Sequence, residues 1–463
     1  MTVARFPDRL CRRECWSLAL FIVSQTLAHS GPAAPGEGAL RYLLARLSPF
    51  RSEGVYYETG DHDRLRLRQS PLDARYIPSF EIPKRSPVYP VLSQYRRAFV
   101  YDMAVSTCAL LLAGKHAEAK GLLRTLECLQ LPDGGLGFSF NAEGDSFYNY
   151  SYLRSGAVAW AGYAAALYQR ETGDRDFEQF ADGVGKWLLK QQVPSEAGDP
   201  RAGLIRAGYG QWSPDYTTLS KERIDWCCTE HAIDSFFLFR LLARTTGDEA
   251  TRAEYMAAAE RLKNALMGTL WTETTDGSGR FFQGVSPRGL DRGEALDCCT
   301  WGALFLIAIG ENQKAERALW HAEKTFRTPI GSAVRAAVRP VRGYRPYAGV
   351  NEGVNWDNYA DLVWSEGALG CALAYLRLGR KDRFASIVTE TLTLCARPGD
   401  PSTGVRYSRY RQDLAAPGGG KVGRDDFIKD FTQAPSVCAT AWLLLVQESA
   451  KAANSGKFWG QDE

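Results

Sequence analysis

The sequence lacks the patterns that mark several classes of protein. Only five of its 463 residues are histidines, and no two of them have the spacing of metal ligands. The 56 basic and 53 acidic residues nearly cancel to a net charge of +3, which favours neither nucleic acid nor an anionic membrane as the main partner. The glycine-rich stretches 134–137 and 418–421 match neither the P-loop nor the dinucleotide-binding pattern, and no Ser/His/Asp arrangement stands out. We therefore expect no cofactor.

Long apolar runs are also scarce, and the most marked one lies near the start of the chain. Residues 16–28 are apolar, follow four arginines and precede a small-x-small cleavage site, which predicts a signal peptide over 1–30. Asp8 and Glu14 are atypical of such a segment, and the alternative is an N-terminal helix of the folded domain. The run is too short to span a bilayer. We expect export to the periplasm or the extracellular space rather than a cytoplasmic location, and no membrane insertion of the mature chain.

The eleven cysteines do not form the pattern of a disulfide framework, which is unusual in a chain of this size. Several stand alone on apolar helix faces, where cysteine is a common core residue. Two vicinal pairs allow an alternative, a zinc site with an open position, if the helices that carry them are neighbours. Its ligands would come from Cys227, Cys228, His231, Cys298 and Cys299. We expect packing rather than metal.

The most regular feature of the chain is a pair of helices that recurs five times. The first helix of each pair is apolar on nearly every side, which is typical of a buried helix, and the second is amphipathic. The apolar helices are expected at 99–113, 153–171, 226–244, 296–309 and 362–378, and their partners at 117–130, 177–187, 255–270, 315–326 and 384–395. Glycines 114, 173, 247, 310 and 379 follow the apolar helices in the position that favours the left-handed conformation.

A sixth apolar helix at 437–446 and an N-terminal helix at 38–48 complete the series. Buried helices that alternate with half-buried ones predict two concentric layers, an all-α (α/α)6 toroid over residues 31–463, with the Pro-rich segment 50–95 packed on it. The rival is a tetratricopeptide solenoid, whose repeats have a constant length of about 34 residues. The long connections all return to the apolar helices, so we expect them on one face, above the N-termini of the inner ring.

Polar residues at the starts of the apolar helices should therefore converge on one funnel. Glu230 and Asp234 are four residues apart and share a helix face. Carboxylates that face each other across a cleft suit glycoside chemistry, in which one protonates the leaving oxygen and the other activates water or attacks the sugar. The predicted catalytic residues are Glu230 as general acid, with Asp361 or Glu366 as base or nucleophile.

The long loops are rich in aromatic residues, whose rings can pack on the apolar face of a sugar. Trp226, Trp356 and Trp364 are the candidates for such platforms. Polar side chains around them would hold the sugar hydroxyls or tune the pKa of the catalytic pair. The predicted contacts of this kind are Tyr101, Asp102, Arg154, His231, Asp234, Asp297 and Asp357. The predicted cleft is rich in acidic and aromatic residues, and the chain carries little net charge. This combination is typical of a cleft that binds a neutral polysaccharide.

Four strings carry a resemblance to a known group of proteins: YDMAVSTCALLLAGKHAEAKGLL, CTEHAIDSFFLFRLLARTTGD, ALDCCTWGALFLIAIGE and VWSEGALGCALAYLRLG. They resemble six-hairpin glycosidase-like proteins over roughly residues 95–450. The resemblance implies an (α/α)6 toroid with acid and base carboxylates at inner-helix N-termini, and a carbohydrate-active enzyme, most simply a glycoside hydrolase.

The same fold leaves other functions open, because one scaffold hosts many chemistries. A sugar epimerase or polysaccharide lyase would use His231 as a proton-transfer base. A non-catalytic scaffold for glycan binding or polysaccharide assembly would bind sugar without turnover. A zinc-dependent toroid similar to lanthionine cyclases would carry stoichiometric zinc.

Overall fold

The computed structural model describes residues 35–52, 56–59, 63–66, 68–82, 84, 96–142, 152–196, 198–212, 219–328, 342–351, 353–409, 427–428 and 431–460. The predicted signal peptide lies outside these residues, as does part of the Pro-rich segment 50–95. The extent of the predicted single domain, 31–463, stays a prediction.

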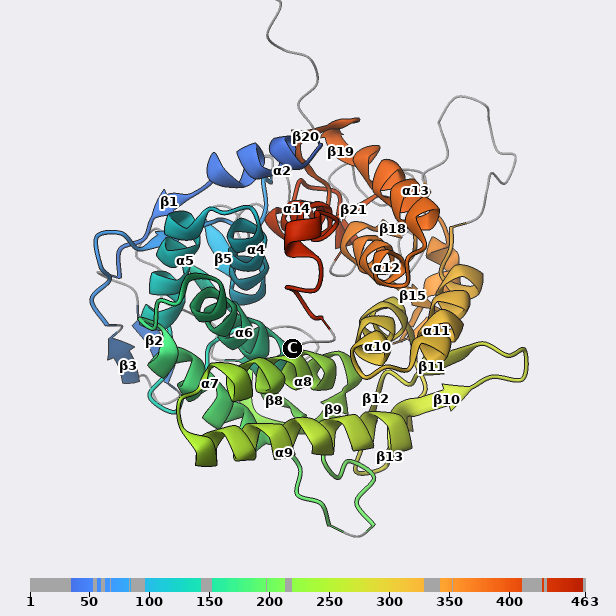
Figure 1. Cartoon of the computed structure of the whole chain (residues 1–463), viewed down its shortest axis with the longest axis horizontal. Coiled ribbons are helices and arrows are strands. Elements are labelled where there is room, and N and C mark those ends of the chain that lie inside the picture. The colour runs from blue at the N-terminus through green and yellow to red at the C-terminus, as the bar shows by residue number, and fades with distance from the viewer. Residues whose placement is uncertain are drawn as a thin grey trace, which may run out of the picture.

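The helices form two concentric rings (Figure 1). The inner ring consists of α4 (Val100–Leu112), α6 (Ser155–Thr172), α8 (Thr229–Thr245), α10 (Leu296–Ala308), α12 (Ser365–Arg377) and α14 (Val437–Ser449). The outer ring consists of α5 (His116–Cys128), α7 (Glu178–Gln191), α9 (Glu249–Ala265), α11 (Asn312–Thr325), α13 (Lys381–Leu392) and α2 (Pro35–Leu44). The chain also has a short π-helix, η1 (Leu266–Leu270), and two short 3₁₀-helices, η2 (Trp356–Tyr359) and η3 (Ala452–Asn454).

The inner ring is closed. Each inner helix packs on the next one along the chain, and α14 returns to pack on α4. Buried residues are spread over nearly the whole length of the inner helices, whereas the outer helices bury only one stripe each. This difference follows from the sequence pattern, since an apolar helix gains most when both of its sides are covered. The structure therefore has the predicted (α/α)6 toroid.

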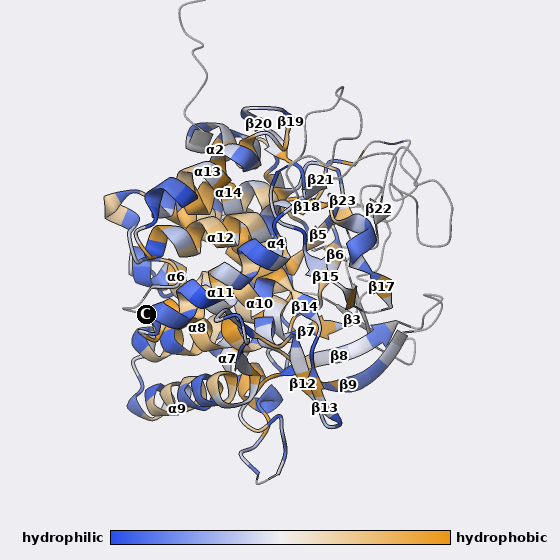
Figure 2. Cartoon of the chain, turned by 90° about the vertical axis from the view of Figure 1, so that its right-hand side faces the viewer, coloured by the Kyte–Doolittle hydropathy of each residue, from blue (hydrophilic) through white to orange (hydrophobic). Residues whose placement is uncertain are grey.

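The connections contain short antiparallel strands, which the prediction of an all-α fold did not place. Figure 2 shows most of them gathered at one end of the helical rings, whereas β19 and β20 lie beside α2. Strands β13, β12, β9, β8 and β7 form one sheet of five, and the others pair in twos. The strands are β1 (Ser48–Pro49), β2 (Tyr56–Thr59), β3 (Asp63–Arg66), β4 (Arg75–Tyr76), β5 (Arg97–Phe99), β6 (Ser139–Asn141), β7 (Leu153–Arg154), β8 (Arg206–Trp212), β9 (Leu219–Cys228), β10 (Trp271–Glu273), β11 (Gly279–Phe281), β12 (Gly284–Ser286), β13 (Gly289–Asp291), β14 (Glu294–Ala295), β15 (Tyr347–Ala348), β16 (Val350–Asn351), β17 (Val354–Asn355), β18 (Val363–Trp364), β19 (Cys395–Arg397), β20 (Asp400–Val405), β21 (Ser408–Arg409), β22 (Phe427–Ile428) and β23 (Phe431–Thr432).

Extended backbone precedes every inner helix. Strands β5, β7, β9, β14 and β18 end at the residue before their helix, and Ser436 before α14 pairs with Phe80 in an isolated bridge. The predicted helix starts at 226 and 362 were therefore wrong, because Trp226 lies in β9 and Trp364 in β18. Pairing with a neighbouring loop fixes the direction of each inner helix at its first residue.

Four of the five predicted helix-ending glycines have the expected left-handed backbone. Gly114, Gly173, Gly310 and Gly379 have φ between 71° and 84°. Gly247 does not, so the prediction was wrong at that position. Helix α8 ends at Thr245, Thr246 is extended, and Asp248 caps the next helix, where its carboxylate accepts a hydrogen bond from Thr251 N at 2.8 Å.

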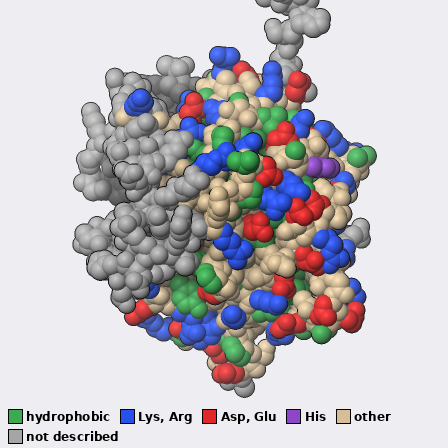
Figure 3. Space-filling view, turned by 90° about the vertical axis from the view of Figure 1, so that its left-hand side faces the viewer, with side chains coloured by type: hydrophobic (Ala, Val, Ile, Leu, Met, Phe, Trp, Pro, Cys, Tyr) green, Lys and Arg blue, Asp and Glu red, His purple; other side chains and the backbone are tan. Residues whose placement is uncertain are grey.

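The surface gives little sign of a preferred charge. On the face in Figure 3, Lys and Arg side chains lie interspersed with Asp and Glu side chains. Among the described helices, none is both long enough and apolar enough to cross a membrane.

Candidate functional site

The second residue of each inner helix occupies an equivalent position around the ring axis, at the end where the strands gather. These six positions are Tyr101, Gly156, Glu230, Asp297, Glu366 and Cys438. Side chains at equivalent positions of equivalent helices point in equivalent directions. Contacts link them across the ring, because Glu366 on α12 meets both Tyr101 on α4 and Cys438 on α14. We refer to the four carboxyl groups of Glu230, Asp234, Asp297 and Glu366 as the carboxyl cluster.

Glu366 is held on both of its carboxyl oxygens. The Tyr101 hydroxyl donates a hydrogen bond to Oε1, and the Cys438 thiol donates one to Oε2 at 3.2 Å. The Trp442 indole in turn donates to the Tyr101 oxygen at 3.0 Å, which fixes the direction of the tyrosine proton. Burial raises the pKa of Glu366 to about 7, although the two hydrogen bonds act in the opposite direction. Burial also holds the pKa of the Cys438 thiol well above its usual range, so it stays a donor.

The other three members of the cluster repel one another. Removal from solvent raises the pKa of Glu230 well above its usual range, and the negative charges of Asp297 and Glu366 raise it further. Burial and the charge of Glu230 have the same effect on Asp234, which lies one turn deeper on α8. The pKa of Asp297 is also raised by burial, and its carboxylate accepts a hydrogen bond from Cys298 N at 2.7 Å. Burial and mutual repulsion thus both favour the protonated form of these groups.

Asp102 is a fifth buried carboxyl, one residue beyond Tyr101. Burial raises its pKa to about 8, and the charge of Glu366 adds to the effect. The side chain keeps its proton in the folded chain up to that pH, whereas in the unfolded chain it ionises near pH 4. Stability is therefore lost as pH rises between these values, by up to about 1.4 kcal/mol for each pH unit.

Replacing Asp102 by asparagine should remove this pH dependence. The melting temperature of the wild type is expected to fall from pH 5 to pH 8, and that of Asp102→Asn to fall less. Calorimetry at several pH values measures the difference, with Asp382→Asn on exposed α13 as the matched control. Parallel curves for wild type and Asp102→Asn would contradict a protonated Asp102.

The opposite side of the funnel carries a glycine and the positive charge of Arg154. A Cβ added at Gly156 would lie 2.5 Å from His231 Cδ2 and 2.9 Å from Asp234 Oδ2, so the absence of a side chain makes room for both. Arg154 donates hydrogen bonds to the carbonyls of Leu153 at 3.1 Å and Gly210 at 2.9 Å. Burial and the nearby Arg154 charge lower the pKa of His231 to about 3, so its imidazole is neutral.

One set of side chains in the funnel has the composition of metal ligands. The ligand atoms of Cys228, Glu230 and His231 lie within 4.8 Å of one another, and the described residues contain no other such group of three. They could hold a zinc-like ion. The guanidinium of Arg154 beside His231 opposes a cation there, and we assign no metal to them. Of the predicted zinc ligands, Cys298 also lies close enough to Cys228 for their charges to interact.

The predicted site residues in the loop before α12 differ in how far they are buried. Asp361 lies in the turn four residues before α12 and is half-buried. Asp357 is exposed and forms an ion pair with Arg345 at 2.8 Å. Trp356 has only 1% of its surface exposed, because it packs on Tyr347, Tyr359 and Phe431, so it offers a sugar almost no surface.

The other two predicted platforms lie closer to the inner helices. Trp364 precedes α12 directly and stacks on Trp301, with ring centres 6.3 Å apart and ring planes at 7°. Trp226 is half-buried in β9, against the backbone of Gly284. In the sequence, Trp364 stands two residues before Glu366, and Trp226 stands four residues before Glu230.

An aromatic layer below the cluster was missed from the sequence. Trp160, Trp301 and Trp442 stand four residues after Gly156, Asp297 and Cys438, one helical turn deeper. Their rings meet across the ring axis, with centres 5.8 Å apart for Trp160 and Trp442 and 5.0 Å for Trp301 and Trp442. The spacing of four from the second residue of each helix is the signal that would have found them.

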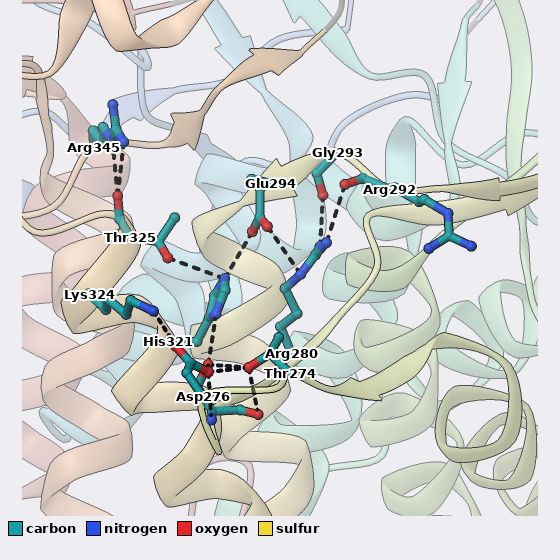
Figure 4. A network of polar contacts seen from close by, with 11 residues as sticks. Thr274, Asp276, Arg280, Arg292, Gly293, Glu294, His321, Lys324, Thr325 and Arg345 are labelled. Atoms are coloured by element: carbon teal, nitrogen blue, oxygen red, sulfur yellow. Dashed lines mark hydrogen bonds and ion pairs between the residues drawn. The ribbon is translucent and has the colours of Figure 1, made fainter.

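A separate polar network supports the start of α10 (Figure 4). His321 Nε2 lies 3.0 Å from Glu294 Oε2, and its Nδ1 lies 3.2 Å from Ser278 Oγ. Although serine, histidine and glutamate resemble a hydrolytic triad, Ser278 has no exposed surface and donates to Asp276 Oδ1 at 2.7 Å. Arg280 binds Glu294 at 3.1 Å. The network therefore ties the β10–β11 hairpin and α11 to the segment three residues before Asp297.

Neither a family model nor a curated protein matches this sequence. Solved structures do match. A novel alpha-amylase from Clostridium perfringens has a TM-score of 0.56 at 10% identity, over 91% of this chain and 99% of that one. A metal-independent alpha-mannosidase from Streptococcus pneumoniae, in complex with alpha-1,6-mannobiose, has a TM-score of 0.54 at 10% identity, over 95% and 99%. A family 76 glycoside hydrolase from Bacteroides thetaiotaomicron has a TM-score of 0.51 at 11% identity, over 89% and 76%. This likeness confirms the predicted fold, an (α/α)6 toroid.

Proposed function

We propose that this chain is a glycoside hydrolase that acts on a neutral oligosaccharide or polysaccharide. One observation carries the proposal. Two carboxyl groups from different inner helices, Glu230 and Glu366, belong to one cluster at the strand-bearing end of the toroid, and their surroundings differ. Glycoside hydrolysis needs such a pair, one carboxyl protonated and the other ionised.

The surroundings support a role for each residue of the pair. Glu366 accepts hydrogen bonds on both oxygens, which stabilises its ionised form and fixes its orientation. It serves as the base that activates water, or as the nucleophile that attacks the anomeric carbon. Glu230 keeps its proton because it is shielded from solvent and faces the charges of Asp297 and Glu366. It donates this proton to the leaving glycosidic oxygen.

The remaining predicted residues surround this pair. Asp297 raises the pKa of both carboxyls and so helps to keep the acid protonated. Asp361 stays the alternative base, and Asp361→Asn tests it against Glu366→Gln. The proposed sugar contacts are Tyr101, Asp102, Arg154, Trp226, His231, Asp234, Asp357 and Trp364. Trp356 is not among them, because its ring is buried.

The substrate is expected to be neutral. Glu366, the proposed base, acts in its ionised form, and its negative charge disfavours the anionic groups of uronic acids and sulfated sugars beside it. Two of the similar structures are described as an alpha-amylase and as an alpha-mannosidase with alpha-1,6-mannobiose. Alpha-linked glucose and mannose oligosaccharides are therefore the first substrates to test.

The experiment is incubation of the purified chain with these oligosaccharides and measurement of new reducing ends. Glycoside hydrolysis predicts products whose release depends on Glu230. NMR of the first product formed tells inversion from retention by its anomeric form. Saturable sugar binding with no product would instead support a binding scaffold, and a product that absorbs in the ultraviolet would support a lyase. The neutral His231, whose pKa is about 3, is a weak base for lyase or epimerase chemistry.

The hydrogen bond from Tyr101 should be visible in the pH dependence. Because Glu366 acts as base only when ionised, kcat/KM should fall as pH drops through its pKa, near 7 in the wild type. Tyr101→Phe removes a donor that stabilises the ionised form, so this acid limb should move to higher pH. Tyr168→Phe, which removes a hydroxyl bonded to Asp174 at the far end of α6, should leave it in place. An unmoved limb in Tyr101→Phe would argue against Glu366 as the base.

A further inference from the structure

The chain after α14 turns back into the centre of the ring. Beyond η3, residues 456–460 lie on the axis of the toroid, at the end opposite the strands (Figures 1 and 2). The side chains of Phe458 and Trp459 are buried, at 0% and 2% exposure. Segment 456–460 therefore occupies the opening that the inner helices leave at this end.

Aromatic packing holds the segment in the ring. Trp459 stacks face to face on Phe237 of α8, with ring centres 4.5 Å apart and planes at 6°. It also lies against Trp160 of α6 at 4.9 Å and meets Trp301 of α10 edge-on at 6.3 Å. Phe458 packs on Trp160 at 5.8 Å. One pair of residues thus contacts inner helices on several sides of the axis.

Polar contacts clamp the backbone of the same segment. Arg377 at the end of α12 donates to the carbonyl of Phe458 at 2.6 Å, and Arg170 near the end of α6 donates to that of Lys457. The amide of Trp459 donates to the Tyr163 hydroxyl at 3.0 Å. Trp459 has φ of 47°, which a tryptophan adopts only where its surroundings impose it. The position of the segment is therefore specific rather than incidental.

The segment is connected upward to the carboxyl cluster through two tryptophans. Trp442 donates its indole proton to Tyr101, which binds Glu366. Trp160 meets the ring of Tyr101 edge-on at 5.3 Å and lowers the pKa of Asp234 against the effect of burial. Phe458 contacts both of these tryptophans. One aromatic layer separates the segment from the acids.

We propose that segment 456–460 is a plug that closes the ring opposite the strands, keeps water from reaching the carboxyl cluster from that side, and positions Tyr101 and Glu366 through Trp160 and Trp442. Trp459 is thus a positioning residue that acts through other residues. The positioning role rests on the proposed function, whereas the exclusion of water does not. Burial is the largest cause of the raised pKa of Glu230, Asp234 and Glu366, so the cluster depends on staying dry.

The alkylation rate of the Cys438 thiol measures the entry of water, and this measurement needs no substrate. The thiol binds Glu366, is 2% exposed, and has a pKa raised mainly by burial. Trp459→Ala should admit water, and each unit by which the thiol pKa falls gives about tenfold more thiolate and faster alkylation. Mass spectrometry measures alkylation of Cys438 by iodoacetamide, with Cys128 and Cys395 outside the inner ring as internal references. Trp459→Leu, which leaves a smaller gap, should give an intermediate rate.

A matched control separates water entry from general loss of stability. Phe177→Ala removes an equally buried aromatic residue from the outer layer, at 1% exposure. Cys438 should react at least about tenfold faster in Trp459→Ala than in Phe177→Ala at equal distance below the melting temperature. Equal rates in the two variants, or a Cys438 as slow as in the wild type in both Trp459 variants, would overturn the plug.

The pH profile tests the link to the acids. Water stabilises ionised carboxylates, whereas loss of the Tyr101 hydrogen bond destabilises ionised Glu366, so these two effects of Trp459→Ala move the acid limb of kcat/KM in opposite directions. The positioning role therefore predicts that Trp459→Ala shifts the limb by different amounts in the wild type and in Tyr101→Phe, where that hydrogen bond is already absent. Equal shifts in the two backgrounds with a fast-reacting Cys438 would overturn the positioning role and keep the exclusion of water. A chain without hydrolytic activity would refute the proposed function, and the alkylation rates would still decide the plug.

Discussion

Glu230→Gln should abolish hydrolysis while the chain remains folded. Glutamine has the shape of the protonated carboxyl and cannot give up a proton, so the leaving oxygen departs without help. Loss of a general acid lowers kcat by about 10²- to 10⁴-fold. The wild type must keep Glu230 protonated in the folded chain at pH 8, where the same group is ionised in the unfolded chain, and glutamine lacks this cost. The melting temperature of Glu230→Gln at pH 8 should therefore be equal to that of the wild type or higher. Reducing-end assays and calorimetry measure the two effects.

The same substitution at the second proposed catalytic residue, together with a control substitution, completes the test. Glu366→Gln should also lose about 10²- to 10⁴-fold, because glutamine neither activates water nor attacks the sugar. Glu254→Gln on the exposed face of α9 should retain full activity. Substantial turnover in both Glu230→Gln and Glu366→Gln would rule out the proposed pair and return attention to Asp361.

Gly156→Ala should damage the site although it places a better helix former in α6. The new Cβ would lie 2.5 Å from His231 Cδ2 and 2.9 Å from Asp234 Oδ2, closer than such contacts occur, so both side chains must move. A displacement of about 1 Å near the reacting groups lowers kcat by about 100-fold. The gain in helix propensity of about 1 kcal/mol offsets part of the steric cost, so the fold should persist.

Gly268→Ala provides the matched control. No atom lies within 4 Å of a Cβ added at Gly268, which is helical and exposed. This variant should keep both its activity and its circular dichroism spectrum. Normal activity in Gly156→Ala would mean that His231 and Asp234 can move without consequence, and would remove them from the set of proposed sugar contacts.

The helical frame was predictable because it depends on a pattern that repeats. Apolar helices alternate with amphipathic ones, and helix-ending glycines such as Gly114 and Gly379 adopt the backbone that only glycine adopts readily. The strands were not predictable in the same way. Most pair over two or three residues, too few for an alternating pattern, and the longer β9 carries a charged run from Lys221 to Arg223.

The site was predictable where polarity marks a helix start. Glu230, Asp297 and Glu366 stand out because a carboxyl at the start of an apolar helix has no reason to be in the core. Cys438 and Gly156 occupy the same second position and carry no such mark. Trp459 could not be placed at all, because no local pattern shows that a segment ten residues beyond its last inner helix turns back into the ring.

The extended residues before each inner helix affect which amino-acid substitutions the chain can accept. Backbone pairing with a neighbouring loop, rather than a capping side chain, begins five of the six inner helices, and only Ser436 caps its own helix. Substitution of a capping Ser, Thr or Asp lowers the stability by about 1 kcal/mol. A helix whose first turn has no such cap cannot lose stability in this way. The second positions are thus not needed to cap these helices. A descendant of this chain can acquire a different reaction by substitutions confined to one circle of residues, while the frame that holds them is inherited unchanged.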